Sequence, residues 1–242
     1  NADELEEAAI SYRDHANALA DQVKRDADGN VKFSDFKTLA NQAGDGFRVL
    51  TYQYSYSVFA GSTLPVKELG WADMYTSMGI TGLTMGITGE AAVNPQIPDV
   101  CLPFTMCHEM AHRMCIAQER DANFAGFLAA SVNPSIEFQY SAYFMAYRYC
   151  YNALASANST NAAAAAARVA SGAHSLLKRD LTYYNTFFSD NRNETATKVA
   201  ATANNTYITA SGDPAGTVSY ERVVDLLVNW HIQQVVLPSI TV

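Results

Sequence analysis

Apolar side chains recur at steps of three and four residues along most of the chain, which is the spacing of one face of an α-helix. In residues 2–27 this face comprises Leu5, Ala8, Tyr12, Ala16, Leu19 and Val23. A second helix is expected from an N-cap at Ser34 to about Tyr56. Further helices are expected at about 103–116, 119–130, 137–154, 158–188, 192–211 and 220–234. The pattern predicts a mainly helical protein.

The stretch that follows Gly61 departs from this spacing. Residues 80–85 and 87–93 read as two short β-strands that meet near Gly86 or Gly89, and a short helix is expected around residues 71–77. The expected fold class is therefore mainly α (α+β), a helical domain with a small β-sheet or hairpin before the helix at 103–116. We expect a single domain over residues 1–242, with N-terminal helices in 1–60, the sheet and two central helices in 61–130, and a C-terminal helical part in 131–242.

One segment of the chain contains candidate metal-binding and catalytic residues. It is the sequence His-Glu-Met-Ala-His at residues 108–112. On a helix His108 and His112 lie about one turn apart, so both imidazoles leave the same face and can share one metal ion. Glu109 then lies beside the metal, where a carboxylate can accept a proton from a metal-bound water. This motif is typical of zinc hydrolases, so one Zn²⁺ ion is the expected cofactor.

A catalytic zinc ion commonly keeps three protein ligands and one water, so a third ligand is expected elsewhere. Gln118 stands where a third histidine follows in the longer form of the motif, which disfavours that class. Glu119 is the better candidate and Asp121 the alternative. Asn123 shares a helix face with Glu119 and is expected to hydrogen-bond a metal ligand. This arrangement is similar to that of the gluzincin group of peptidases, whose glutamate ligand lies on the following helix.

Several segments together resemble a bacterial family known as domain of unknown function 3810. They are Gly86 to Asn94, Leu102 to Thr105, the motif at 108–112, Glu119 to Phe124, Tyr140 to Tyr143 and Ser219 to Leu227. The resemblance implies a membrane-anchored, gluzincin-like zinc peptidase with His108, His112 and Glu119 as ligands and Glu109 as the base. The sequence departs from the family at Cys115, where relatives usually have a glycine, so no residue that breaks helices is expected between His112 and Glu119.

Substrate-binding residues are expected on the second short strand. In zincin-like peptidases a strand before the metal helix pairs with an extended substrate, which here would place Glu90, Ala91 and Ala92 on the rim of the cleft. An ordinary sheet that only covers the core is the alternative.

Candidates for a donor to the oxyanion are tyrosines and one arginine. Tyr220 and Arg222 follow a predicted N-cap at Ser219 and a turn at residues 212–216, at a helix start that can aim a donor into a cleft. Tyr140 and Tyr143 are alternatives, and His231 is a weaker one. His15 and His174 are expected to be surface or structural residues, and the aromatic group Tyr52, Tyr54, Tyr56 and Phe59 is expected in the core.

Composition and charge argue against some classes of binding partner. The net charge is −8 and the charged residues are scattered, which argues against binding of nucleic acid or an anionic membrane surface. No run of 18 apolar residues is present, so the chain itself is expected to be soluble. It begins without a methionine at Asn1, which suggests that an upstream part was removed, and the resemblance implies that this part anchors an extracytoplasmic domain in the membrane. The four cysteines are expected to be free buried thiols, and a Cys101–Cys150 disulfide is the alternative.

The leading hypothesis is a zinc metallopeptidase that acts on a peptide or protein substrate. A Glu109 base would take a proton from the zinc-bound water and pass it to the leaving amine. A zinc-binding sensor domain that no longer cuts anything, and a structural module without metal, are the two alternatives.

Overall fold

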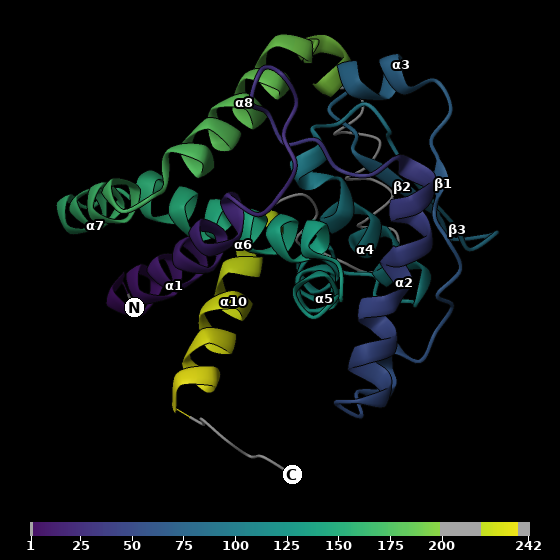
Figure 1. Cartoon of the computed structure of the whole chain (residues 1–242), viewed down its shortest axis with the longest axis horizontal. Coiled ribbons are helices and arrows are strands. Elements are labelled where there is room, and N and C mark those ends of the chain that lie inside the picture. Colours follow the sequence, from purple (N-terminus) through teal and green to yellow (C-terminus); the bar gives the residue numbers. More distant parts are fainter. Residues whose placement is uncertain (1, 199–218, 237–242) are drawn as a thin grey trace.

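The computed structural model describes residues 2–198 and 219–236, and it is mainly helical with one small sheet (Figure 1). The α-helices are α1 Ala2–Ala20, α2 Phe36–Tyr52, α3 Ala72–Ser77, α4 Leu102–Arg113, α5 Glu119–Ser131, α6 Ile136–Ser156, α7 Thr160–Ser171, α8 Ser175–Asn191 and α10 Ser219–Val236. Two 3₁₀ turns, η1 Ser57–Phe59 and η2 Asp99–Cys101, and the strands β1 Lys67–Glu68, β2 Gly82–Met85 and β3 Glu90–Val93 complete the described elements. The predicted fold class is confirmed.

Helix α4 lies at the centre of the molecule. It packs against β2 and β3 on one side and against α2, α5 and α6 on the others, while α1 lies along α6 and α10 packs against α5 and α6 (Figure 1). The buried apolar side chains form one cluster that runs from Ala8 in α1 to Leu227 in α10. Because α4 is covered on so many sides, almost every residue from Leu102 to Ala111 is buried, and its polar residues must find partners inside the protein.

The sheet has three strands in the order β1, β3, β2. The predicted hairpin corresponds to β2 and β3, which pair antiparallel with Gly82 opposite Val93 and Thr84 opposite Ala91. Strand β1 was not predicted, and it pairs parallel with the end of β3. With only two residues it is too short to show an alternating pattern. Strand β3 is therefore the central strand, and β2 is an edge strand.

Two predicted helix boundaries are wrong for a shared reason, a tertiary contact near each end. Helix α1 ends at Ala20 rather than near 27, because Arg25 and Val31 form a β-bridge around a turn at Gly29. Helix α2 is capped by Asp35, whose side chain accepts a hydrogen bond from the Thr38 amide. The predicted cap, Ser34, instead donates its amide and its hydroxyl to Glu137.

The helix predicted over 158–188 is two helices, α7 and α8. The chain breaks at Gly172, where a Cβ atom would lie 2.3 Å from Arg13 Nη1, and Asn17 of α1 donates to the Gly172 carbonyl. His174 then caps α8 by accepting from the Leu176 amide. Contacts with α1, which local sequence cannot report, decide this break.

The aromatic group near the end of α2 is only partly buried, contrary to prediction. Phe59 is buried, but Tyr52, Tyr54 and Tyr56 are exposed. Tyr52 is the last residue of α2 and the other two follow it, and their exposed hydroxyls can stay hydrated.

Part of the predicted C-terminal helices falls outside the described residues. Of the helix expected at 192–211, residues 194–198 are helical, residues 192 and 193 are not, and residues 199–211 are not described. The turn at 212–216 also lies outside the described residues. The last helix agrees with prediction, since Val223, Val224 and Leu227 of α10 are buried. Within the described helices, none is long and apolar enough to span a bilayer.

Candidate metal centre

Helix α4 carries both histidines of the motif. Pro103 lies in its first turn, where a missing backbone donor costs nothing. One turn separates His108 from His112, so their side chains meet, and the two Nε2 atoms lie 3.1 Å apart. Helix α5 approaches closely here, because a Cβ atom on Gly126 would lie only 3.1 Å from the His108 amide nitrogen. The close approach brings the start of α5 to the two imidazoles.

The turn between α4 and α5 uses Cys115 as a helix terminator. Its φ angle is +68°, in the left-handed region that glycine usually occupies. The Cys115 amide donates to the His112 carbonyl at 2.9 Å and the Ile116 amide donates to the Ala111 carbonyl at 3.2 Å, which is the Schellman pattern of helix ends. No helix breaker was expected from the sequence between His112 and Glu119, but Cys115 itself takes the left-handed conformation that ends α4.

This turn also orients His112. The Ile116 carbonyl lies 2.8 Å from His112 Nδ1, so this nitrogen carries the proton and donates it. In the neutral imidazole the Nε2 atom then keeps a lone pair, and this atom faces His108 and Glu119. A backbone carbonyl that fixes the tautomer is a common support for a histidine that binds a metal.

Glu119 is the first residue of α5, and it completes a cluster with the two histidines. Its Oε2 lies 3.3 Å from His108 Nε2 and its Oε1 lies 3.5 Å from His112 Nε2. Among the described residues these three form the only group of His, Cys, Asp or Glu side chains with metal-binding spacing. The carboxylate of Asp121, the alternative ligand, instead lies 2.8 Å from Arg120 Nε, outside this group.

The separations in this cluster fit one small cation. Tetrahedral zinc with bonds of about 2.0–2.2 Å holds its ligand atoms about 3.3–3.6 Å apart. The three ligand-to-ligand distances here are 3.1, 3.3 and 3.5 Å. Glu119 is 8 % exposed, and its Oε2 is buried without a hydrogen-bond partner in the described part of the chain. A buried carboxylate oxygen of this kind requires a cationic partner, and the residues present fit a metal ion.

The charges of the cluster favour a cation between the ligands. Burial lowers the pKa of His112, but the hydrogen bond and the negative charge of Glu119 outweigh it and raise this pKa to about 9. Burial raises the pKa of the Glu119 carboxyl, but its hydrogen bonds and charge interactions with His108 and His112 outweigh burial and lower this pKa below its ordinary value. The carboxylate thus favours a positive charge at this point, which a proton or a metal cation can supply.

Glu109 lies on the side of α4 that faces strand β2. It is 5 % exposed, and its Oε2 lies 2.7 Å from the Thr84 hydroxyl. Burial raises the pKa of Glu109 above its ordinary value, although His108, His112 and Thr84 oppose the change. A carboxylate with a raised pKa is a stronger base, so its burial suits a group that must take a proton from water.

Tyr149, which was not predicted as a site residue, hydrogen-bonds Asn123 on the helix that begins with Glu119. Asn123 is buried one turn after Glu119, and its Oδ1 accepts a hydrogen bond from Tyr149 at 3.3 Å. The expected hydrogen bond from Asn123 to a metal ligand is not among the contacts of the described residues. The Asn123 Nδ2 group is buried without a partner among the described residues. Burial and several charges, including that of Glu119, raise the pKa of Tyr149, so its hydroxyl stays protonated. Tyr149 lies in α6, and no local pattern distinguishes it from the other tyrosines of that helix.

The remaining candidates lie in other surroundings. The Tyr140 hydroxyl donates to Asp180 in a separate buried network, and the Tyr143 ring stacks on His15. His231 packs against the ring of Tyr12. The side chains of Tyr220 and Arg222, at the start of α10, lie outside the described residues.

The three residues of β3 that were expected on the substrate rim, Glu90, Ala91 and Ala92, lie in the central strand of the sheet and not at an edge. Ala91 is buried in the central strand, which is paired on both sides, and Glu90 forms an exposed ion pair with Lys67. The edge available for pairing with a peptide belongs to β2 instead. Its register with β3 could not be read from two short apolar runs.

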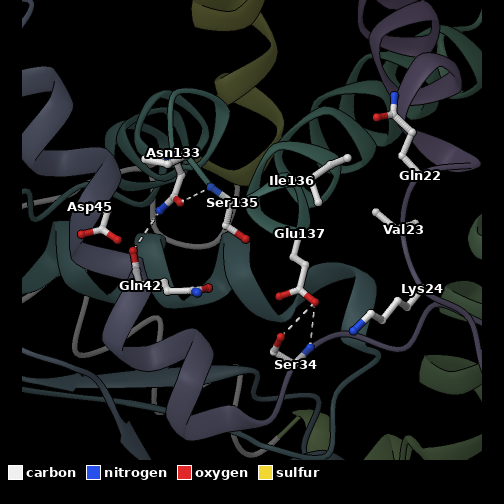
Figure 2. Close-up of a pocket in the computed structure, with 11 residues that line it drawn as sticks. Gln22, Val23, Lys24, Ser34, Gln42, Asp45, Asn133, Ser135, Ile136 and Glu137 are labelled. Carbon is white, nitrogen blue, oxygen red and sulfur yellow. Dashed lines mark hydrogen bonds between the residues drawn. The ribbon is translucent and has the colours of Figure 1, made fainter.

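A separate cavity of about 470 Å³ lies between the loop after α1, helix α2 and the start of α6, and none of the three candidate ligands lines it (Figure 2). Its polar groups largely pair with one another. Ser34 donates to Glu137, and Asn133 donates to the Gln42 carbonyl while accepting from the Ser135 amide. This mutual pairing is typical of a structural joint between elements.

The three free thiols at Cys101, Cys107 and Cys150 are buried, and Cys115 is a free exposed thiol. No cysteine joins the metal-binding group among the described residues.

A family model described as protein of unknown function (DUF3810) matches residues 1–228. The chain belongs to this family. No curated protein and no solved structure matches it.

Proposed function

We propose that this member of the DUF3810 family is a zinc-dependent metallopeptidase of the gluzincin kind. The observation that carries the proposal is the convergence of His108, His112 and Glu119, whose ligand atoms are 3.1 to 3.5 Å apart, with Glu109 buried beside them. Two imidazoles and one carboxylate are the ligand set of several zinc peptidases, and three protein ligands leave a tetrahedral position for water.

The donor types favour zinc over other common cations. Calcium and magnesium prefer six or more oxygen ligands, whereas two of the three ligands here are imidazole nitrogens. The short turn through Cys115 holds the ligands in a compact group, which suits a small cation with few ligands.

A zinc ion at this site would polarise a bound carbonyl and lower the pKa of its bound water. Glu109 would accept the proton of that water on its carboxylate. The water oxygen would bond to the carbonyl carbon of the substrate, and the same carboxylate would then give the proton to the amide nitrogen as the carbon–nitrogen bond breaks, so that the leaving group departs as a neutral amine. His112, held by the Ile116 carbonyl, and Glu119, on the first turn of α5, would keep the ligand geometry constant during both transfers.

An extended peptide is the substrate that best fits the edge of the sheet. Strand β2 has one neighbour, β3, so its other edge can pair with a peptide backbone. Leu83 and Met85 are 36 % and 49 % exposed on the outer face of this strand. Cross-strand neighbours of these side chains would be apolar, so we propose a preference for extended segments with apolar residues.

The donor to the oxyanion is proposed to be Tyr220, with Arg222 at the substrate. Both belong to the first turn of α10, and this helix packs against α5, which begins with the ligand Glu119. Replacement Tyr220→Phe should lower kcat and leave KM nearly constant.

The decisive experiment combines metal content with turnover. Protein purified without added metal should contain about one zinc ion by mass spectrometry of the elements. Glu109→Gln should keep that zinc and lose nearly all hydrolysis of an unfolded protein substrate such as a reduced, alkylated globular protein. Glu194→Gln, whose carboxylate is on the surface, is the matched control and should behave as the wild type. Undiminished turnover by Glu109→Gln, or a wild type with zinc but no turnover on any peptide, would refute the peptidase.

A further inference from the structure

The geometry points to Thr84 of β2 as a positioning residue, whose hydroxyl holds the Glu109 carboxylate in the orientation that proton transfer requires. This inference rests on the proposed peptidase function. It assigns a role to the edge strand beyond pairing with a peptide.

The first observation is a hydrogen bond between the strand and the base. Thr84 Oγ1 lies 2.7 Å from Glu109 Oε2 and 3.0 Å from the Glu109 backbone carbonyl. A hydroxyl has one proton, and a carboxylate is the stronger acceptor, so the proton is directed to Oε2. In the part of the chain that the structure describes, this is the one hydrogen bond to the Glu109 carboxylate.

The second observation is steric and independent of the first. Gly82 lies two residues before Thr84, on the same face of β2. A Cβ atom at position 82 would lie 2.4 Å from Glu109 Oε1 and 2.7 Å from its Cδ. The strand backbone therefore covers one oxygen of the carboxylate while Thr84 binds the other, and the side chain has little freedom to rotate.

The strand itself is held in place by buried neighbours. Thr84 pairs with Ala91 and Gly82 pairs with Val93, and the side chains of both partners are buried in the core. Because β3 is fixed between two strands, the position of the Thr84 hydroxyl follows from the register of the sheet. Strand β2 is proposed to pair with the substrate along its free edge. Its inner face, which carries Thr84, also orients the proposed base Glu109. We therefore expect Thr84 to affect the chemical step more than substrate affinity.

The test compares three threonine variants in the zinc-loaded full chain. Thr84→Val keeps the shape and removes the donor, Thr84→Ser keeps the donor, and Thr88→Val changes an exposed threonine of the same hairpin. Thr84→Val should lower kcat about 10- to 100-fold with KM changed less than about twofold and zinc content unchanged. Thr84→Ser should restore kcat to within about threefold, and Thr88→Val should match the wild type.

Gly82→Ala provides a second test that leaves the donor intact. The added methyl group would displace the carboxylate, so kcat should fall by at least about tenfold with zinc retained. Wild-type kcat in either Thr84→Val or Gly82→Ala would overturn the inference, as would a Thr84→Ser variant as slow as Thr84→Val.

Failure of the peptidase proposal gives a different result, because the wild type itself would then show no turnover. In that case the hydrogen bond between Thr84 and Glu109 is tested by a double-mutant cycle, in which the free energy of unfolding is measured for Thr84→Val, Glu109→Gln and the double variant. A bond to a charged group should couple the two changes by about tenfold or more in the unfolding equilibrium constant. Additive effects would show that Thr84 does not hold Glu109.

Discussion

Two buried polar clusters of this protein differ in how their charges are balanced. In the first, Arg25 donates to both carboxylate oxygens of Asp180, at 2.7 and 2.9 Å, and the Tyr140 hydroxyl donates to the same group. In the second, the imidazoles of His108 and His112 and the carboxylate of Glu119 direct acceptor atoms at one point. The first cluster contains a permanent cation, Arg25, whereas in the second the positive charge comes from a proton on an imidazole or from a metal ion.

This difference separates a structural role from a binding role. The Arg25 and Asp180 pair joins the loop after α1 to α8, and Tyr140 adds α6 to the same joint. Its charges cancel when the chain folds. The His108, His112 and Glu119 cluster is buried equally well, but its free lone pairs are stabilised only by a proton or a metal ion. A buried charged cluster is therefore not by itself a candidate metal site. A cluster in which several acceptor atoms converge without a fixed cation is a candidate.

The largest effect on stability is expected from the buried cluster of Arg25, Asp180 and Tyr140. Asp180→Asn would leave the Arg25 guanidinium, which is mostly buried, without its counter-charge, at a cost of about 3–5 kcal/mol in the free energy of unfolding. Denaturant titration measures this loss, and Asp190→Asn on the exposed end of the same helix is the control. The folded fraction should still bind zinc normally. A loss below about 1 kcal/mol would contradict the structural assignment of this pair.

The largest effect on metal binding is expected at Glu119. Glu119→Gln replaces an anionic ligand by a neutral amide, so the zinc dissociation constant should rise more than about a hundredfold, or about 2.7 kcal/mol. Competition with a chromogenic chelator measures it. Asp121→Asn is the matched control two residues away, and its affinity should not change. The reverse result would transfer the ligand role to Asp121.

A smaller effect is expected from the residue that supports the ligands. Tyr149→Phe removes the donor to Asn123 Oδ1, so the zinc affinity should fall up to about tenfold and the free energy of unfolding by about 1 kcal/mol. Tyr151→Phe, on the same helix, should leave zinc affinity at the wild-type value. Equal zinc affinity in Tyr149→Phe and the wild type would remove Tyr149 from the metal centre.

The smallest effect, and one of opposite sign, is expected at the turn between the ligands. Cys115→Gly relieves the positive φ of this residue and should raise the free energy of unfolding by about 0.5–1 kcal/mol, with zinc affinity unchanged. Thermal unfolding at constant zinc concentration measures the gain. Cys115→Ser removes the thiol without relieving the backbone and should give no gain. Equal stabilisation by both variants would assign the effect to the thiol instead of the φ angle.

The grouping of the three proposed metal ligands could be predicted because it depends on short spacings along the chain. His108 and His112 are neighbours on any helix, and Glu119 follows within one short turn, so spacing alone brings the three together. Thr84 and Tyr149 could not be predicted in the same way. They reach the site from a strand 25 residues before Glu109 and a helix 26 residues after Asn123, through contacts that leave no periodic signal.

The errors in the fold have the same origin. Residues 158–188 are mostly helix-forming with Gly172 as a weak point, and contacts of Arg13 and Asn17 from α1 with Gly172 accompany the break of the helix there. Ser34 is as good a cap as Asp35 by type, but Glu137 occupies its donors. In each case a distant side chain decides between two local structures of similar free energy.

By itself the amino-acid sequence determined the helical class, the helices α4 to α6 and the grouping of His108, His112 and Glu119, because these depend on spacing within a turn or two of helix. Only the tertiary structure decided that Cys115 takes a left-handed turn, that β2 rather than β3 is the open edge, and that Thr84 lies against Glu109. Those features depend on which elements are packed together, and packing brings into contact residues whose separation along the chain carries no information about their distance in space.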